Sequence, residues 1–132
     1  MGYTWLLNRM IARLDAEGLE VPLGMLHAYR PGRPSLACDL IEPLRVPLVD
    51  RWVLESCSRA WVKPEDFVTT AQGVRLEKDA FGRVLGRWEN TWLQTDGARL
   101  LEQRVHRFIT GLRQSKNEPA AEDAPALENR PE

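Results

Sequence analysis

Cysteine and histidine are both scarce in this sequence, which has two of each among its 132 residues. Cys38 and Cys57 are too few and too widely separated to form a metal knuckle. Both interrupt apolar helical patterns, so we expect them to be reduced thiols in the core of a cytosolic protein.

Long apolar runs are also lacking. No segment approaches the length of a membrane span, and Met1 is not followed by the basic and apolar regions of a signal peptide. The sequence has no internal repeat and no glycine-rich phosphate loop. Its 43% hydrophobic content is that of one small soluble domain, and the sequence signals neither a membrane partner nor a nucleotide cofactor.

The formal net charge is only −1, but the charge is unevenly distributed. Residues 116–132 hold five acidic and two basic side chains. This segment has almost no large apolar residue, which predicts a disordered acidic tail. Residues 1–115 carry 16 basic and 14 acidic side chains, a net charge of +2 that is compatible with DNA binding without being specific for it.

The apolar periodicity predicts a mainly α-helical, bundle-like domain over residues 1–115. A small β-hairpin is predicted near residues 69–76, packed on the helices because an isolated hairpin is not stable. We expect amphipathic helices at 3–17, 46–61, 77–93 and 98–113, and a short helical turn at 63–67. The inward face of the second of these helices is expected to comprise Val49, Trp52, Val53, Cys57 and Ala60.

One stretch, residues 24–50, gathers most of the side chains that could carry chemistry. A helix through its second half places the apolar residues on one arc and Asp39 and Glu42 together on the opposite side. Carboxylates three residues apart repel mildly, and a divalent cation between them would offset that repulsion, although a solvated helix face is the common alternative. His27 precedes Asp39 by twelve residues, across a loop long enough to fold the imidazole over the acids.

The loop between His27 and this helix is basic and rich in proline. Arg30 and Arg33 are its cations, and taken alone they would ordinarily be solvated loop charges. Further along the helix, Pro43 and Pro47 are expected to cause a kink or a restart.

A family resemblance changes the weight of these features. Gly24 followed three residues later by His27, then Arg33-Pro34-Ser35-Leu36, then Asp39-Leu40-Ile41-Glu42-Pro43-Leu44-Arg45, resembles the C-terminal helical domain of the CRISPR-associated integrase family. The likeness covers most of residues 2–115. That family comprises metal-dependent DNA endonucleases and integrases of spacer acquisition.

The resemblance implies a site and a reaction. It makes His27 and Glu42 metal ligands for Mg²⁺ or Mn²⁺, with Asp39 as the adjacent essential carboxylate, and it leads us to expect Arg30 and Arg33 at DNA phosphates. The implied reaction transfers 3′-hydroxyl ends of foreign DNA into the repeat array by phosphodiester transesterification. The implied partners are protospacer and repeat DNA, a second copy of the chain, and a small ferredoxin-like adaptation protein.

The sequence departs from the family pattern upstream of the motif. The family's first metal-binding glutamate comes from a helix that follows an N-terminal β-rich domain, whereas only 26 residues precede His27 here. Glu17 and Glu20 do not match the context of that glutamate. We therefore expect an incomplete C-terminal portion of such an integrase.

Two other functions remain open on the sequence. One is a catalytically inert helical module, derived from such an integrase, that binds DNA or a protein. The other is a helix-turn-helix regulator, for which the proline-rich loop at 31–34 is a poor recognition turn. Arginines on the later segments could follow a phosphate backbone or form a solvated face. They are Arg75, Arg83, Arg87, Arg99, Arg104, Arg107 and Arg113.

Overall fold

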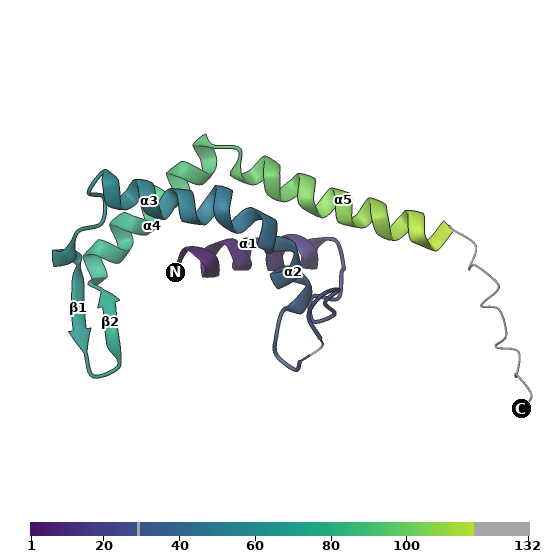
Figure 1. The fold of residues 1–132 in the computed structure, drawn as a ribbon, viewed down its shortest axis with the longest axis horizontal. Coiled ribbons are helices and arrows are strands. Elements are labelled where there is room, and N and C mark those ends of the chain that lie inside the picture. The colour runs from purple at the N-terminus through teal and green to yellow at the C-terminus, as the bar shows by residue number, and fades with distance from the viewer. Residues whose placement is uncertain (29, 118–132) are drawn as a thin grey trace, which may run out of the picture.

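The computed structural model describes residues 1–28 and 30–117 and is mainly α-helical, which confirms the predicted fold class (Figure 1). In chain order the elements are α1 (Gly2–Ala16), α2 (Ser35–Leu44), the π-helix η1 (Arg45–Asp50), α3 (Arg51–Ser58), the 3₁₀-helix η2 (Pro64–Asp66), β1 (Phe67–Thr70), β2 (Gly73–Leu76), α4 (Lys78–Gln94) and α5 (Gly97–Asn117). The tail predicted for 116–132 lies outside the described residues, except that Lys116 and Asn117 belong to α5.

Helix α1 packs against both α2 and α5 and supplies the centre of the core. Leu6, Met10 and Leu14 recur every fourth residue on one face and are fully buried. The helix ends in a turn in which the Leu19 N–H donates to the Leu14 carbonyl at 3.1 Å. Gly18 adopts a φ of +68° in that turn, a conformation that favours glycine. This stop sends the chain into the loop that carries His27.

Helix α2, η1 and α3 follow one another as a single bent rod, with α5 running alongside it (Figure 1). The predicted kink or restart takes the form of the π-helix η1, which contains Pro47. Proline cannot donate the backbone hydrogen bond that an α-helix needs there, and a wider turn accommodates the loss without ending the rod. The rod therefore continues without a break from the candidate site into the aromatic part of the core.

The predicted inward face of residues 46–61 is only partly correct. Val49 and Trp52 are buried, but Val53, Cys57 and Ala60 are exposed. Helix α3 ends before Ala60, which lies in the next turn with a φ of +51°. Val53 and Cys57 line an open apolar groove of about 510 Å³ beside the start of α1, so packing does not cover them.

The two cysteines are free thiols, but the prediction that they lie in the core is wrong. Cys38 is half-buried and Cys57 is exposed. The buried residues of α2 include Leu36, Ala37, Leu40 and Ile41, and Cys38 lies at the edge of this packed arc.

Aromatic side chains join α1, α3 and α4. The Trp52 and Trp88 rings meet edge to face with centroids 5.2 Å apart, and Trp5 lies 5.6 Å from Trp88 and 6.1 Å from Trp52. Edge-to-face contacts of this kind are favourable because the positive ring edge meets the negative ring face. The cluster fixes α4 against the rod, and α4 in turn packs against α5.

The hairpin projects from the end of the rod beside α4 (Figure 1). Strands β1 and β2 pair antiparallel, with Phe67 opposite Leu76 and Thr70 opposite Gly73. The hairpin begins at Phe67, slightly earlier than predicted. Among the helices described, none is long and apolar enough to pass through a bilayer.

Candidate functional site

The loop that carries His27 folds tightly against the start of α2. The Leu36 N–H donates to the Val21 carbonyl at 3.0 Å, which closes the loop at its base. At Gly24 an added Cβ would lie 2.6 Å from the His27 carbonyl oxygen and 2.8 Å from the Ser35 Cβ. Glycine is therefore required by this close approach, which gives a physical reason for the glycine three residues before the histidine.

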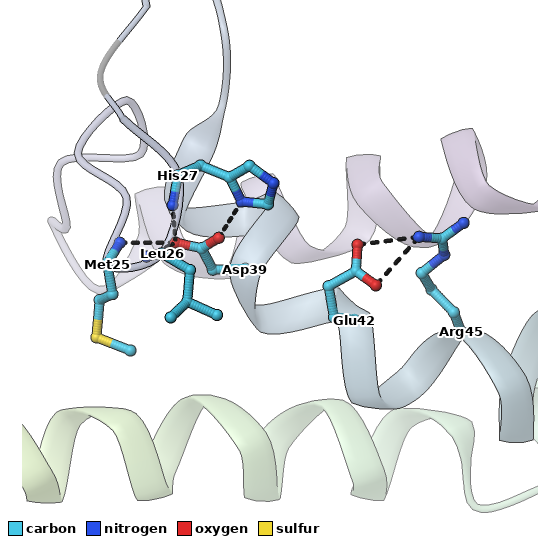
Figure 2. Close-up of polar contacts among 6 residues, drawn as sticks. All are labelled: Met25, Leu26, His27, Asp39, Glu42 and Arg45. Atoms are coloured by element: carbon cyan, nitrogen blue, oxygen red, sulfur yellow. Dashed lines mark hydrogen bonds and ion pairs between the residues drawn. The ribbon is translucent and has the colours of Figure 1, made fainter.

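Asp39 is the buried acceptor on which this loop is organised. The Asp39 side chain is 1% exposed. Its Oδ2 accepts hydrogen bonds from the backbone N–H of Met25 at 2.6 Å and of Leu26 at 2.9 Å, with the His27 N–H at 3.5 Å. Oδ1 bonds the His27 imidazole (Figure 2). The carboxylate thus fixes the loop through three consecutive backbone amides and one side chain.

These hydrogen bonds outweigh the effect of burial on the acidity of Asp39. Burial raises the pKa of the carboxyl, but the hydrogen bonds from the Leu26 amide, the His27 ring and the Met25 amide lower it further, to about 2. Asp39 is therefore ionised at neutral pH and can only accept hydrogen bonds.

The ionised state of Asp39 fixes the tautomer of His27. Because Asp39 can only accept, the Nδ1 of His27 must carry the proton that it donates to Asp39 Oδ1. In the neutral ring the lone pair then lies on Nε2, and the imidazole side chain is 34% exposed. A histidine held by a carboxylate through one ring nitrogen, with the other nitrogen directed outward, is the arrangement commonly found at metal-ligating histidines.

Glu42 lies one turn further along α2 and has a different environment. Its side chain is 48% exposed, and its oxygens accept from Nη1 of Arg45 at 2.9 and 3.1 Å. The Arg45 guanidinium lies 4.3 Å over the Tyr3 ring, and the Tyr3 hydroxyl donates to Asp50. Figure 2 shows the His27 imidazole and the Glu42 carboxylate on the side of α2 that faces away from α5.

The three predicted ligands are therefore not equivalent. The structure brings His27 and Asp39 into direct contact, whereas Glu42 is paired with Arg45. Within residues 1–28 and 30–117 no group of three or more His, Cys, Asp or Glu side chains is arranged to hold a metal ion.

The donor set fits a metal ion in part. His27 Nε2 and the Glu42 oxygens are outward-facing donors of the types that Mn²⁺ and Mg²⁺ accept. Asp39 does not fit as a direct ligand, because its oxygens are already engaged by Met25, Leu26 and His27. Its position suits it to orient His27 instead.

The two loop arginines lie close to His27 in the chain. Arg30 is exposed and Arg33 is half-buried, and neither forms an ion pair with any other described residue. The Arg33 N–H donates to the Arg30 carbonyl at 3.0 Å across a turn in which Gly32 has a φ of +75°. Their guanidinium groups are thus available to anions beside the site.

The sequence did not reveal three contributors to this geometry. The backbone amides of Met25 and Leu26 fix Asp39, but backbone donors carry no residue-type signal. Gly24 was part of the motif, yet its close approach to Ser35 is a tertiary contact. Arg45 follows Glu42 at a helical spacing of three, and that spacing could have predicted the ion pair.

Comparison with known proteins gives a consistent result. The model of the family described as CRISPR associated protein Cas1 matches residues 1–90, so the chain belongs to the Cas1 family. The CRISPR-associated endonuclease Cas1 2 of Rhodospirillum rubrum is 37% identical over 108 residues, which are 81% of this chain and 29% of that protein. The CRISPR-associated endonuclease Cas1 3 of Thermus thermophilus is 34% identical over 113 residues, 86% of this chain and 31% of that protein.

Two solved structures are also similar to this chain. A casposase bound to integration product superposes with a TM-score of 0.62 at 30% identity, over 68% of this chain and 26% of that one. A CAS1 protein from Thermotoga maritima shares the fold, with a TM-score of 0.74 at 20% identity over 81% of this chain and 35% of that one. The chain thus spans about 30% of the length of the curated relatives it matches.

Proposed function

We propose that this chain carries part of the active site of a metal-dependent DNA endonuclease and integrase of CRISPR adaptation. The observation that supports it best is the His27 and Asp39 pair, in which a buried carboxylate fixes the imidazole tautomer and turns Nε2 outward. The named Cas1 endonucleases and the casposase among the similar proteins support the same reaction class.

In this proposal each side chain has a distinct role. His27 Nε2 and Glu42 are the metal ligands, and Asp39 is a positioning residue that acts through His27. Mg²⁺ or Mn²⁺, when bound, supplies Lewis-acid activation of a phosphodiester and stabilises the attacking or leaving oxygen. Arg30 and Arg33 hold DNA phosphates through charge-assisted hydrogen bonds.

Glu42 has to exchange its partner for this to occur. Its ion pair with Arg45 is largely exposed, and exposed pairs contribute little to stability, so the carboxylate can leave Arg45 at small cost. The released guanidinium then becomes a further cation beside the DNA. Since two donors are fewer than a metal site needs, we propose that another carboxylate comes from outside the described residues.

The proposed reaction joins the 3′-hydroxyl of an incoming DNA strand to a phosphate of the repeat array. One phosphodiester is exchanged for another, so no nucleotide cofactor is required. The further proposed partners are a second copy of the chain and a small ferredoxin-like adaptation protein, and the proposed location is the cytoplasm, where the array lies.

Titration with Mn²⁺ tests the ligand assignment. We expect His27→Ala to weaken Mn²⁺ binding, and Asp39→Asn to weaken it by about 10- to 100-fold, as for other residues that orient a metal-ligating histidine. His106→Ala removes the second histidine of the chain and serves as the matched control. Binding isotherms that are the same for His27→Ala and the unaltered chain would remove His27 from the site.

A second function is favoured by a specific observation. The pairing of Glu42 with Arg45 and the lack of a three-residue metal group in the described part of the chain suit a catalytically inert module that binds DNA or a protein. Nicking of DNA that needs Mn²⁺ and disappears in Glu42→Ala supports the enzyme. DNA binding that weakens with salt, without any turnover, supports the module.

A further inference from the structure

A concave feature lies between the His27 loop and α5. It is a pocket of about 360 Å³, with Met25 and Leu40 on one wall and residues of α5, from Arg104 to Ser115, on the other. Figure 2 shows the Met25 side chain directed toward α5, whereas the His27 imidazole points away from that helix. The pocket is therefore separate from the candidate metal site, which lies on the opposite side of the loop.

The α5 wall of the pocket carries positive charge that no described residue offsets. Arg104 and Arg107 line it, and no acidic side chain does. The ion pairs that α5 makes within the described residues involve Arg99 and Glu102 instead. The Nε of Arg104 is buried and has no acceptor among the described residues. Buried donors are nearly always satisfied in folded proteins, so this N–H indicates an anionic group that the described residues do not supply.

Along α5 the pocket changes from basic to apolar. Arg104 and Arg107 line the part nearer the start of the helix, and Gly111 and Leu112 line the part nearer its end. An added Cβ at Gly111 would meet nothing within 4 Å, so this part of the wall is open. Leu112 is 44% exposed. A chain that runs back from the end of α5 therefore passes an open apolar surface before it reaches the two arginines.

The sequence that follows α5 has the same two parts in the matching order. Residues 119–121 are Pro-Ala-Ala, which are small and apolar, and the next two residues are Glu122 and Asp123. Residues 118–132, which lie outside the described part of the chain, hold five acidic side chains and one basic one. A segment that turned back along α5 would thus place small residues over Gly111 and carboxylates beside the arginines.

The distances along the chain fit this register. At about 1.5 Å per helical residue, Arg107 lies about 15 Å and Arg104 about 20 Å before Asn117, the last residue of α5. An extended chain spans about 3.3 to 3.6 Å per residue. Glu122 therefore reaches about 17 Å from Asn117, and Asp123 about 20 Å. Each carboxylate can reach one of the two arginines.

We propose that residues 119–123 of this chain bind in this pocket, with the carboxylates of Glu122 and Asp123 on Arg107 and Arg104. Hydrogen bonds between guanidinium and carboxylate groups are charge-assisted, and they supply the acceptor that the buried Arg104 Nε lacks. The segment is covalently joined to the helix that lines the pocket. Such linkage gives a local concentration on the order of millimolar, which favours this segment over a free anion.

This contact goes beyond the proposed function, because it regulates access to the pocket. Any anion that uses Arg104 and Arg107 has to displace the segment first. Weak anions therefore do not enter, whereas a polyanion with more charges than the two carboxylates does. Since Arg107 is exposed, its ion pair is screened by salt, and the contact weakens as the ionic strength rises.

NMR spectroscopy of the ¹⁵N-labelled full chain in EDTA tests the contact, because the Nε–H groups of Arg104 and Arg107 give their own signals. We expect the double variant Glu122→Gln, Asp123→Asn to shift both signals, since the hydrogen bonds lose their charged acceptors. Gly111→Leu fills the open part of the wall without changing charge and should release the segment. In that background the double substitution should cause no further shift, and a full further shift would overturn the proposal.

Glu118→Gln is the matched control, because it removes one acidic charge from the same segment. Glu118 is one residue beyond α5, and a span of about 3.6 Å cannot bring it to either arginine. Glu122→Gln alone should shift the Arg107 signal, and Glu118→Gln should leave it in place. Circular dichroism checks that each variant stays helical. Equal shifts in the two single variants, or none in the double variant, would overturn the proposal.

Titration with inorganic phosphate separates the segment from other occupants. We expect phosphate to bind about fivefold more tightly to the double variant than to the unaltered chain, because the attached competitor is weakened. Equal affinity would assign the pocket to an external anion and overturn the proposal. Shifts that depend on protein concentration would place the segment on a second copy of the chain, which also overturns it. Because these assays are metal-free, loss of Mn²⁺ binding in His27→Ala tests the proposed function independently.

Discussion

The two carboxylates of α2 lie one turn apart, yet they are held in opposite ways. Asp39 is 2% exposed and accepts from backbone amides and from His27, so it cannot change partners without opening the loop. Glu42 has a side chain that is 48% exposed and a single described partner, Arg45. A buried, fully bonded carboxylate positions other groups, whereas an exposed paired one remains free to exchange.

This difference separates the roles that one sequence motif combines. His27 is oriented in advance by the protein, and its orientation does not depend on a ligand. Glu42 is oriented by its ion pair with Arg45, and a cation of higher charge can take the place of the Arg45 guanidinium. Changes at His27 or Asp39 should therefore affect the stability of the fold. Changes at Glu42 should mainly affect metal binding.

The largest loss of stability is expected at Gly24, where the backbone of the His27 loop is closely packed. Gly24→Ala places a Cβ 2.6 Å from the His27 carbonyl oxygen, and the backbone must shift to relieve it. We expect a loss of about 3 kcal/mol in the free energy of unfolding, within the range for substitutions that strain the backbone. Chemical denaturation measures it.

Gly82→Ala is the matched control for this substitution. Gly82 lies within α4, and an added Cβ there meets nothing within 4 Å. We expect it to be neutral or to stabilise by up to about 1 kcal/mol, because alanine favours helix. Equal destabilisation by the two variants would show that the Gly24 contact is not what limits the loop.

A somewhat smaller effect is expected from removing the buried acceptor. Asp39→Ala leaves the N–H groups of Met25 and Leu26 and the His27 ring without their acceptor, at a cost of about 2 to 3 kcal/mol. Glu42→Ala should cost less than about 1 kcal/mol, because its ion pair is exposed. Urea unfolding of both variants gives the comparison, and equal losses would contradict the division between the two carboxylates.

The stability contributed by Asp39 should depend on pH. Its pKa is lowered from 3.8 to about 2 in the folded chain. A group with a depressed pKa stabilises the fold fully above its unfolded value and loses that contribution as the pH falls through its folded value. We therefore expect about 2 kcal/mol to be lost between pH 4 and pH 2.

Comparison with Asp39→Asn isolates this contribution. The amide does not titrate over this range, so the difference in unfolding free energy between the unaltered chain and the variant should shrink as the pH falls. A difference that stays constant from pH 6 to pH 2 would show that the carboxylate is not held in its charged form, contrary to its lowered pKa.

The sequence predicted what depends on local periodicity and could not predict what depends on tertiary contact. The helices and the hairpin follow from apolar spacing and turn residues, and they were predicted with small boundary errors. Asp39 and Glu42 looked equivalent on a helical wheel, because the wheel represents one helix alone and does not include the His27 loop, which covers Asp39. The covering loop is specified by Gly24 and by the amides of Met25 and Leu26, and these leave no periodic pattern.

The smallest change in stability, and the clearest change in binding, is expected at Arg45. Arg45→Ala removes the partner of Glu42 but leaves the His27 and Asp39 pair intact. We expect less than about 1 kcal/mol change in the free energy of unfolding, since exposed ion pairs contribute little.

If Glu42 is a metal ligand, its release from Arg45 should tighten Mn²⁺ binding several-fold, and the double variant with Glu42→Gln should lose that gain. Calorimetric titration of the single and double variants gives the coupling between the two residues. Binding that weakens in Arg45→Ala would mean that the ion pair holds Glu42 in place for the metal and does not compete with it.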